Sequence, residues 1–183
     1  MLINKTVLLK NGKECLLRNV EPSDAKAFLD YFEKSHGETD YLTTYPDETE
    51  HDLTKIAVRL DKAKESPKDI EVLAFIDNRI VGNAGYDMVL EREKTRHRAN
   101  FGITILKEYW GLGIGTALTT ACIEAAKEAG YLQLELETVS GNERAMNLYT
   151  KYGFVVYGRN PRGFISRTGK WQELVLMRLE LDN

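Results

Sequence analysis

The residues with the clearest chemical potential form a short glycine-rich turn. Gly111, Gly113 and Gly115 occupy every second position, directly before an amphipathic segment with helical spacing. Glycine has no Cβ, so the backbone of such a turn can approach a ligand closely. The free N–H groups at a helix N-terminus, together with the helix dipole, favour an anion there. The turn therefore predicts a binding site for a phosphate or a pyrophosphate.

Other uses of a glycine turn compete with this interpretation. A nucleotide P-loop requires Gly-Lys-Ser/Thr, but Gly115 is followed by Thr116 and Ala117, which excludes that motif. A dinucleotide fingerprint requires GxGxxG, and the third glycine falls one position early, although Glu135 and Glu137 lie about 20 residues beyond the turn. A dinucleotide-dependent enzyme remains an alternative, as does a tight strand–helix turn without any ligand.

The order of the predicted elements places this turn between a strand and a helix. Apolar residues with strand or helix spacing alternate along the chain, and no repeat or linker interrupts them. We therefore expect one α/β domain over residues 1–183 with a mixed sheet. The predicted strands are 6–10, 14–19, 71–76, 80–88, 100–106, 132–139, 154–158 and 173–181, and the predicted helices begin near Pro22 and cover 50–65, 116–129 and 143–152.

Composition narrows the class of protein. The formal net charge is −3, which argues against a general nucleic-acid binder. No apolar stretch has the length of a membrane span, and the first residues do not resemble a secretory leader, so a cytoplasmic location is expected. Cys15 and Cys122 are interpreted as buried, reduced thiols. The three histidines lack metal-ligand spacing, and no metal is expected.

A second motif lies downstream on the last predicted helix. It follows the pattern Asn-x-x-Ala-x-x-x-Tyr-x-x-x-Gly-Phe, and one helix and one strand separate it from the glycine turn. The ordered pair resembles the GNAT superfamily of N-acetyltransferases, whose pyrophosphate loop, Arg/Gln-x-x-Gly-x-Gly/Ala, begins the long helix. The residues that match the second pattern are Asn142, Ala145, Leu148, Tyr149, Gly153 and Phe154.

The resemblance implies a fold and an activity. The fold would be a single-domain, mixed and mostly antiparallel β-sheet flanked by helices. The activity would be transfer of the acetyl group of acetyl-CoA to a primary amine, by direct attack in a ternary complex and without a metal. A non-catalytic acyl-CoA-binding module of the same fold remains an alternative.

The resemblance also implies roles for single residues. Tyr149 would protonate the departing CoA thiolate; its alternative is a core aromatic residue beside Leu148 and Tyr152. Asn142 would cap the last helix and could touch the pantetheine arm. The cofactor-binding residues implied in the strand and the turn are Ile103, Thr104, Ile105, Gly111, Leu112, Gly113, Ile114, Gly115 and Thr116.

Two positions depart from the family pattern. Trp110 stands where an arginine or glutamine usually precedes the glycine loop, and Asn100 stands where relatives often carry a glutamate. The second departure leaves the general base open. Candidate bases are Asp87, Glu91, Glu93 and Glu137, and spacing does not distinguish them.

The remaining expectations concern the surroundings of the site. A cluster of basic residues at 92–98 is expected on a solvated loop, with a cationic rim for the CoA phosphates as the alternative. The acceptor is expected to be a small-molecule amine rather than a peptide amine, with no nucleic acid or membrane partner, and the resemblance allows a homodimer. The acceptor walls, for which ordinary exposed loops are the alternative, would come from Glu38, Asp40, Tyr41 and Tyr45 and from the 159–170 connection with Arg162, Phe164 and Arg167.

Overall fold

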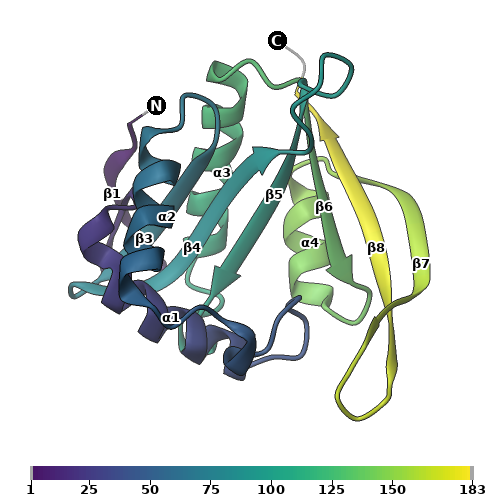
Figure 1. The fold of residues 1–183 in the computed structure, drawn as a ribbon, viewed down its shortest axis with the longest axis horizontal. Coiled ribbons are helices and arrows are strands. Elements are labelled where there is room, and N and C mark those ends of the chain that lie inside the picture. Colours follow the sequence, from purple (N-terminus) through teal and green to yellow (C-terminus); the bar gives the residue numbers. More distant parts are fainter. Residues whose placement is uncertain (1, 182–183) are drawn as a thin grey trace.

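One mixed β-sheet organises the molecule. The computed structural model describes residues 2–181, in which eight strands follow the order β1-β2-β3-β4-β5-β6-β8-β7 (Figure 1). Neighbouring strands run antiparallel except for β5 and β6, which are parallel. The expected α/β fold with a mixed, mostly antiparallel sheet is therefore confirmed.

The strands and helices have the following bounds. The strands are β1 (Asn4–Leu8), β2 (Glu14–Asn19), β3 (Ile70–Ile76), β4 (Arg79–Met88), β5 (Arg98–Ile105), β6 (Gln133–Val139), β7 (Val155–Ile165) and β8 (Trp171–Glu180). The α-helices are α1 (Ala25–Gly37), α2 (Leu53–Glu65), α3 (Ile114–Glu128) and α4 (Glu143–Lys151), and single 3-10 turns are η1 (Pro22–Asp24), η2 (Pro46–Glu48) and η3 (Lys107–Tyr109).

Helices cover both faces of the sheet. Figure 1 shows α1 and α2 in front of it and α3 and α4 behind it. Each side has its own apolar core. Phe28, Leu60 and Leu73 belong to the front core, whereas the expected stripe of Leu118, Cys122, Ala121 and Ala125 lies in the rear core. Both cysteines are free buried thiols, and burial raises the pKa of Cys15 to about 11.

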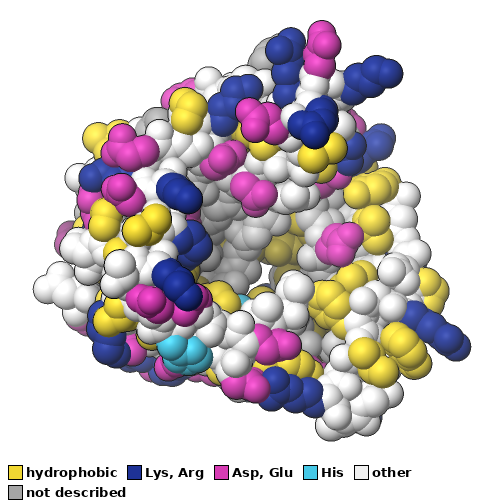
Figure 2. All heavy atoms as spheres, in the orientation of Figure 1, with side chains coloured by type: hydrophobic (Ala, Val, Ile, Leu, Met, Phe, Trp, Pro, Cys, Tyr) yellow, Lys and Arg dark blue, Asp and Glu magenta, His cyan; other side chains and the backbone are white. Residues whose placement is uncertain are grey.

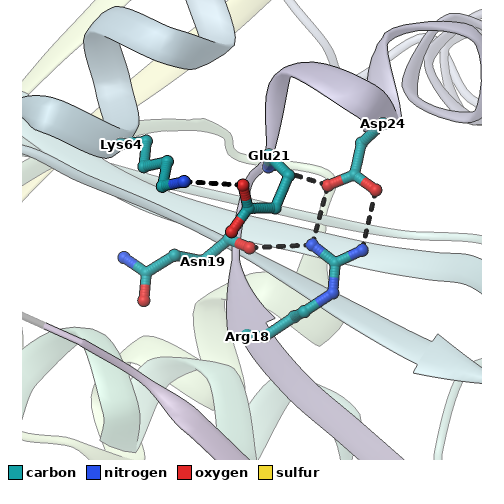
Figure 3. A network of polar contacts seen from close by, with 5 residues as sticks. All are labelled: Arg18, Asn19, Glu21, Asp24 and Lys64. Carbon is teal, nitrogen blue, oxygen red and sulfur yellow. Dashed lines mark hydrogen bonds and ion pairs between the residues drawn. The ribbon is translucent and has the colours of Figure 1, made fainter.

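A partly buried ion pair joins the first helix to the sheet (Figure 3). Asp24 is 8% exposed and accepts from both terminal nitrogens of Arg18, each at 2.7 Å, and from the backbone N–H of Glu21 at 2.8 Å. Arg18 also donates to the carbonyl of Asn19 at 2.9 Å, and Lys64 of α2 donates to Glu21 at 2.7 Å. These bonds fix the start of α1 against β2 and α2.

Two elements differ from their predicted bounds by three residues or more. Helix α2 begins at Leu53 rather than at residue 50, because the Asp52 side chain accepts from the N–H of Thr54 at 2.9 Å and caps the helix there. Strand β7 continues to Ile165, so most of the expected 159–170 connection is strand. Pro161 is tolerated because β7 is the edge strand and its register shifts between Asn160 and Phe164.

Two features are absent from residues 2–181. Within them, no helix combines the length and the apolar character that crossing a membrane requires. Over the same residues, no group of three or more His, Cys, Asp or Glu side chains is arranged to hold a metal ion.

Replacing Asp24 should destabilise the fold. The Asp24→Ala variant leaves the guanidinium of Arg18 and the N–H of Glu21 without their acceptor, so we expect the free energy of unfolding to fall by about 2 kcal/mol. The control is Asp30→Ala, which removes an exposed i,i+4 partner of Lys26 and should change stability by less than about 0.5 kcal/mol. Urea unfolding followed by circular dichroism measures both. Equal effects would contradict a structural role for the partly buried pair.

Candidate active site

Strands β5 and β6 separate partway along their length. Each stays paired with its other neighbour, β5 with β4 as far as Ile105 and β6 with β8 as far as Val139, so a gap opens between their C-terminal halves (Figure 1). The parallel pairing covers only Arg98 with Gln133, Ala99 with Leu134 and Asn100 with Glu135.

Backbone groups of β5 face this gap. The N–H of Leu106 donates to the carbonyl of Val81 on the β4 side at 3.0 Å. Successive residues of a strand direct their backbone groups to opposite edges, so those of Ile103 and Ile105 point toward β6. Trp110 Nε1 donates to the Ile105 carbonyl at 2.7 Å. The N–H and C=O of Ile103 therefore lie at the gap beyond the last paired residue, available to an extended ligand.

The glycine turn ends at the N-terminus of α3. Gly111 and Gly113 have φ values of +80° and +102°, and a Cβ at either would meet nothing within 4 Å. The first helical bond runs from the N–H of Ala117 to the carbonyl of Gly113 at 3.0 Å, and Gly113 caps the helix without a side chain. The N–H groups of residues 114–116 therefore precede the helical ladder, as an anion site requires.

Gly115 has a different role from the other two glycines. It lies within α3, and a Cβ there would stand 3.3 Å from Ile105 Cδ1 and 3.3 Å from Leu148 Cδ2. Its lack of a side chain therefore lets α3 pack closely against β5 and α4. Open space beside the missing Cβ is therefore found at Gly111 and Gly113 but not at Gly115.

A cavity of about 860 Å³ connects the gap and the turn. The molecule is hollowed near the middle of the face in Figure 2. Among the predicted cofactor-binding residues, only Leu112 does not line this cavity; it packs against the rear core, and its carbonyl accepts from the Lys10 N–H at 3.1 Å. The predicted residues that line it are Ile103, Thr104, Ile105, Gly111, Gly113, Ile114, Gly115, Thr116, Asn142 and the predicted acid Tyr149.

Positive charge near the turn comes from residues that sequence reasoning did not select. Lys10, Arg144 and Lys151 line the cavity. The Arg144 guanidinium lies 4.6 Å above the ring of Trp110. Arg144 thus brings a cation beside the position where the family usually has arginine or glutamine. Its place two residues after Asn142, on the first turn of α4, is the signal that could have identified it.

Tyr149 lines the cavity from the buried side of α4. It is 6% exposed and packs against Phe101 and Phe154, with ring centroids 6.3 and 5.7 Å away. Among residues 2–181 no hydrogen-bond partner is found for its hydroxyl. Burial raises the pKa of Tyr149, which keeps the phenol protonated. Asn142 caps α4 as predicted, accepting from the Ala145 N–H at 3.2 Å.

One of the four candidate bases lines the cavity, and three do not. Glu91 and Glu93 lie in the turn between β4 and β5, the teal loop at the top of Figure 1, and neither they nor Asp87 line the cavity. They were wrong as site candidates because the β4–β5 turn lies at the paired end of β5, whereas the gap opens at its other end. Glu137 does line the cavity, together with Glu135, which sequence reasoning did not consider as a base.

The basic cluster at 92–98 lies at the same distant end. None of its residues lines the cavity, and Arg98 forms an ion pair with Glu135. The position of this cluster favours the solvated-loop interpretation over a cationic rim. The cations at the cavity come instead from Lys10 and from α4.

The residues expected at the acceptor walls fall into two groups, those that line the cavity and those that do not. Glu38, Tyr41 and Phe164 line the cavity, whereas Asp40, Tyr45 and Arg167 do not. Arg162 does not line it either; its guanidinium lies 5.3 Å above the ring of Trp171.

We use "clasp" for the contacts between the 38–52 segment and the β7–β8 hairpin. Arg167 donates to both carboxylate oxygens of Asp47, at 2.7 and 2.8 Å, and its guanidinium lies 4.0 Å above the ring of Tyr45. The Tyr45 hydroxyl accepts from the Arg167 N–H and donates to Asp40, both at 3.0 Å. Gln172 donates to the Asp40 carbonyl at 2.9 Å. The clasp thus ties together two segments more than a hundred residues apart in sequence.

His36 is a further lining residue that the sequence did not single out. Its ring stacks on Phe32 with centroids 3.6 Å apart, and its Nδ1 lies 2.9 Å from the Phe32 carbonyl, which assigns the proton to Nδ1. Burial lowers the pKa of His36, so the imidazole is neutral at pH 7.

Two tyrosines of α4 should respond differently to loss of their hydroxyl. Tyr152 Oη donates to the carbonyl of Thr116 at 2.8 Å and lies 2.7 Å from Thr120 Oγ1, so Tyr152→Phe should lower the free energy of unfolding by about 1 kcal/mol. Tyr149→Phe keeps the buried ring and should change stability by less than about 0.5 kcal/mol. Chemical unfolding of both variants distinguishes them. A larger loss for Tyr149→Phe would mean that its hydroxyl supports the fold.

Comparison with known proteins identifies the family. The sequence model of the acetyltransferase (GNAT) family matches residues 26–154. The chain is 25% identical over 166 residues to an L-methionine sulfoximine/L-methionine sulfone acetyltransferase of Pseudomonas paraeruginosa, covering 91% of this chain and 94% of that protein. It is 30% identical over 107 residues to N-alpha-acetyltransferase 30 of Schizosaccharomyces pombe, covering 58% and 71%.

Solved structures agree with this result. An acetyltransferase of the GNAT family from Streptococcus pneumoniae superimposes with a TM-score of 0.86 at 30% identity, covering 91% of this chain and 99% of that one. A Salmonella typhimurium structure with its cofactor acetyl-CoA shares the fold, with a TM-score of 0.81 at 17% identity over 92% and 95% of the two chains. With its split sheet and glycine turn, the chain belongs to the GNAT family of N-acetyltransferases.

Proposed function

We propose that this enzyme transfers the acetyl group of acetyl-CoA to the primary amine of a small molecule, by direct attack in a ternary complex. The single observation that carries the proposal is the juxtaposition in one cavity of the gap beside Ile103, the open glycine turn and the Tyr149 phenol. Acetyl-CoA is further supported by its presence in the structure from Salmonella typhimurium.

The two ends of the cavity offer different groups to the donor. The N–H groups of residues 114–116 suit a diphosphate, and Lys10 and Arg144 add positive charge there. The backbone of Ile103 suits an amide-bearing arm, because its N–H and C=O face the gap. We expect the donor to bind by these groups.

The acceptor must lose a proton before it can attack. An alkylammonium group has a pKa of about 10 and is mostly charged at neutral pH. We propose that Glu137 receives this proton, directly or through water, because it lines the cavity and no ion pair or hydrogen bond of its side chain is found in residues 2–181. The free nitrogen then attacks the thioester carbonyl.

Bond breaking needs a proton on sulfur. As the C–N bond forms, the carbonyl oxygen becomes negative, and backbone N–H groups at the gap can stabilise it. When the C–S bond breaks, the CoA thiolate leaves and takes the Tyr149 phenol proton, and the extra proton on the newly bonded nitrogen passes through water to the Tyr149 phenolate. Phenol donation to a thiolate is uphill, because a thiol has a pKa of about 8.5 against about 10 for an ordinary phenol, and burial raises the pKa of Tyr149 further. The step therefore depends on close placement.

The clasp favours a small acceptor. Its contacts hold the 38–52 segment and the β7–β8 hairpin together beside the acceptor walls Glu38, Tyr41 and Phe164. A long peptide would have to pass between these two joined segments to reach the cavity. The alignment with the Pseudomonas enzyme, which by its name acts on a small amino-acid analogue, also covers more of the chain than the alignment with the Schizosaccharomyces pombe N-alpha-acetyltransferase. A peptide amine is the second candidate.

Two other functions are compatible with the sequence; the fold disfavours one of them, and an assay distinguishes the other. A dinucleotide-dependent enzyme is disfavoured because only β5 and β6 are parallel, whereas a dinucleotide fold is built from successive parallel strands. A non-catalytic acyl-CoA-binding module would retain saturable acetyl-CoA binding but release no thiol with any amine tested.

A methyl group at the glycine turn should weaken donor binding. Gly111→Ala adds a Cβ at the cavity wall, and we expect its dissociation constant for acetyl-CoA to rise about tenfold or more. The matched control is Gly130→Ala at the end of α3, where φ is +82° and a Cβ also meets nothing within 4 Å. Both variants carry similar backbone strain, about 1–2 kcal/mol. Isothermal titration calorimetry gives the affinities. Equal affinities in the two variants would contradict donor binding at the turn.

Removing the Tyr149 hydroxyl should slow turnover without weakening the binding of acetyl-CoA. We expect Tyr149→Phe to lower kcat about a hundredfold, as loss of a general acid does, while the dissociation constant for acetyl-CoA stays unchanged. Thiol release from acetyl-CoA in the presence of an amine measures kcat. Unchanged turnover would remove Tyr149 from the mechanism.

A further inference from the structure

We propose that the acceptor carries a second positive charge and no carboxylate, as in a small diamine, rather than being an α-amino acid. The inference rests on the proposed transfer function and narrows its substrate class. It follows from the way charge is distributed over the cavity wall.

The charged side chains that line the cavity are separated by sign. The cations belong to the side of the glycine turn: the Lys10 N–H bonds to the Leu112 carbonyl, and Arg144 and Lys151 lie on α4. The acidic side chains that line the cavity are Glu38, Glu135 and Glu137.

The two glutamates of β6 face the front side of the sheet. Side chains alternate along a strand, and Leu134 and Leu136 belong to the rear core beneath α3. Glu135 and Glu137 therefore point toward the α1 side. Glu38 is the C-cap residue of α1 and accepts from the Lys107 N–H at 2.6 Å. The donor end of the cavity is thus cationic, and the acceptor end is anionic.

The negative charge at the acceptor end is only partly compensated. Glu135 is neutralised by Arg98, while Lys34 lies 3.9 Å from Glu38 and 2.6 Å from Glu108, so its charge is shared. Residues 2–181 provide no cation paired with Glu137. An acceptor that enters here meets net negative charge.

Among residues 2–181, no lysine or arginine lines this end of the cavity where a substrate carboxylate would lie. Arg98 is paired with Glu135, Arg159 with Glu173, and Arg167 with Asp47. His36 is the remaining basic side chain at the acceptor wall, and its neutral imidazole supplies no charge at pH 7. A carboxylate would lose hydration and face Glu137 without compensation, which is unfavourable.

The same walls suit a diamine. Glu137 can face the reacting nitrogen while Glu38 faces the second ammonium group. Phe32, Tyr41 and Phe164 also line the cavity and offer apolar or aromatic surface to the methylene chain and to a cation. Each end of a diamine is thus recognised through the positive charge of its ammonium group.

Matched acceptors test this inference directly. Thiol release from acetyl-CoA is measured with 1,5-diaminopentane against lysine, and with 1,4-diaminobutane against ornithine, so that each pair differs only by a carboxylate. We expect kcat/KM for each diamine to exceed that for its amino acid about tenfold or more. Equal or higher values for the amino acids would overturn the inference.

A variant tests the second contact. Glu38→Gln keeps an oxygen that can accept from the Lys107 N–H, so the fold should persist. We expect it to raise KM for 1,5-diaminopentane at least about fivefold more than KM for 1-aminopentane, which has no second charge. Glu91→Gln, in the distant β4–β5 turn, is the matched control and should change neither value. Equal effects of Glu38→Gln on the two acceptors would contradict a contact with the second ammonium group.

The design separates this inference from the function on which it rests. Absence of thiol release with every amine, together with absence of acetyl-CoA binding by calorimetry, would refute the proposed transfer function itself. Efficient acetylation of lysine or ornithine would refute only the diamine inference.

Discussion

The structure depends on one interruption of hydrogen bonding. Strands β5 and β6 pair over three residues each and then separate, although each remains held by its outer neighbour. A strand edge inside a protein leaves N–H and C=O groups that need partners. The separation therefore creates both a cavity and a demand for an extended, amide-rich ligand to occupy it. Trp110 takes the carbonyl of Ile105 at 2.7 Å, which leaves the backbone groups of Ile103 facing the gap.

The two sides of this interruption divide the proposed work between them. The half of the sheet from β1 to β5 leads into the glycine turn and the N-terminus of α3, where an anion is favoured. The half formed by β6, β8 and β7 carries Glu137 on β6. Tyr149 lies on helix α4, which connects β6 to β7. In our proposal the reacting groups meet only because the sheet splits between these halves. The charge separation along the cavity follows from the same arrangement, since its cations gather at the turn and its carboxylates face α1.

Local features could be predicted from the sequence because nearby residues determine them. The glycine turn, the Asn142 cap and most strand bounds depend on neighbours within a few positions. The length of β7 could not be predicted, because Pro161 argues against a strand unless the strand is known to lie at an edge. The contact of Arg144 with Trp110 and the clasp between Asp47 and Arg167 both require the packed fold. The candidate bases at 91 and 93 failed for the same reason, because spacing does not indicate at which end of β5 the gap opens.

Amide hydrogen exchange with and without acetyl-CoA tests the central claim most directly. The account predicts slower exchange on binding at residues 103 and 105 and at residues 114–116, where N–H groups face the gap and the turn. It predicts no change in the distant turn at residues 89–97. Protection confined to other segments, or protection at 89–97 without any at 103, 105 and 114–116, would contradict the placement of the donor between β5 and β6.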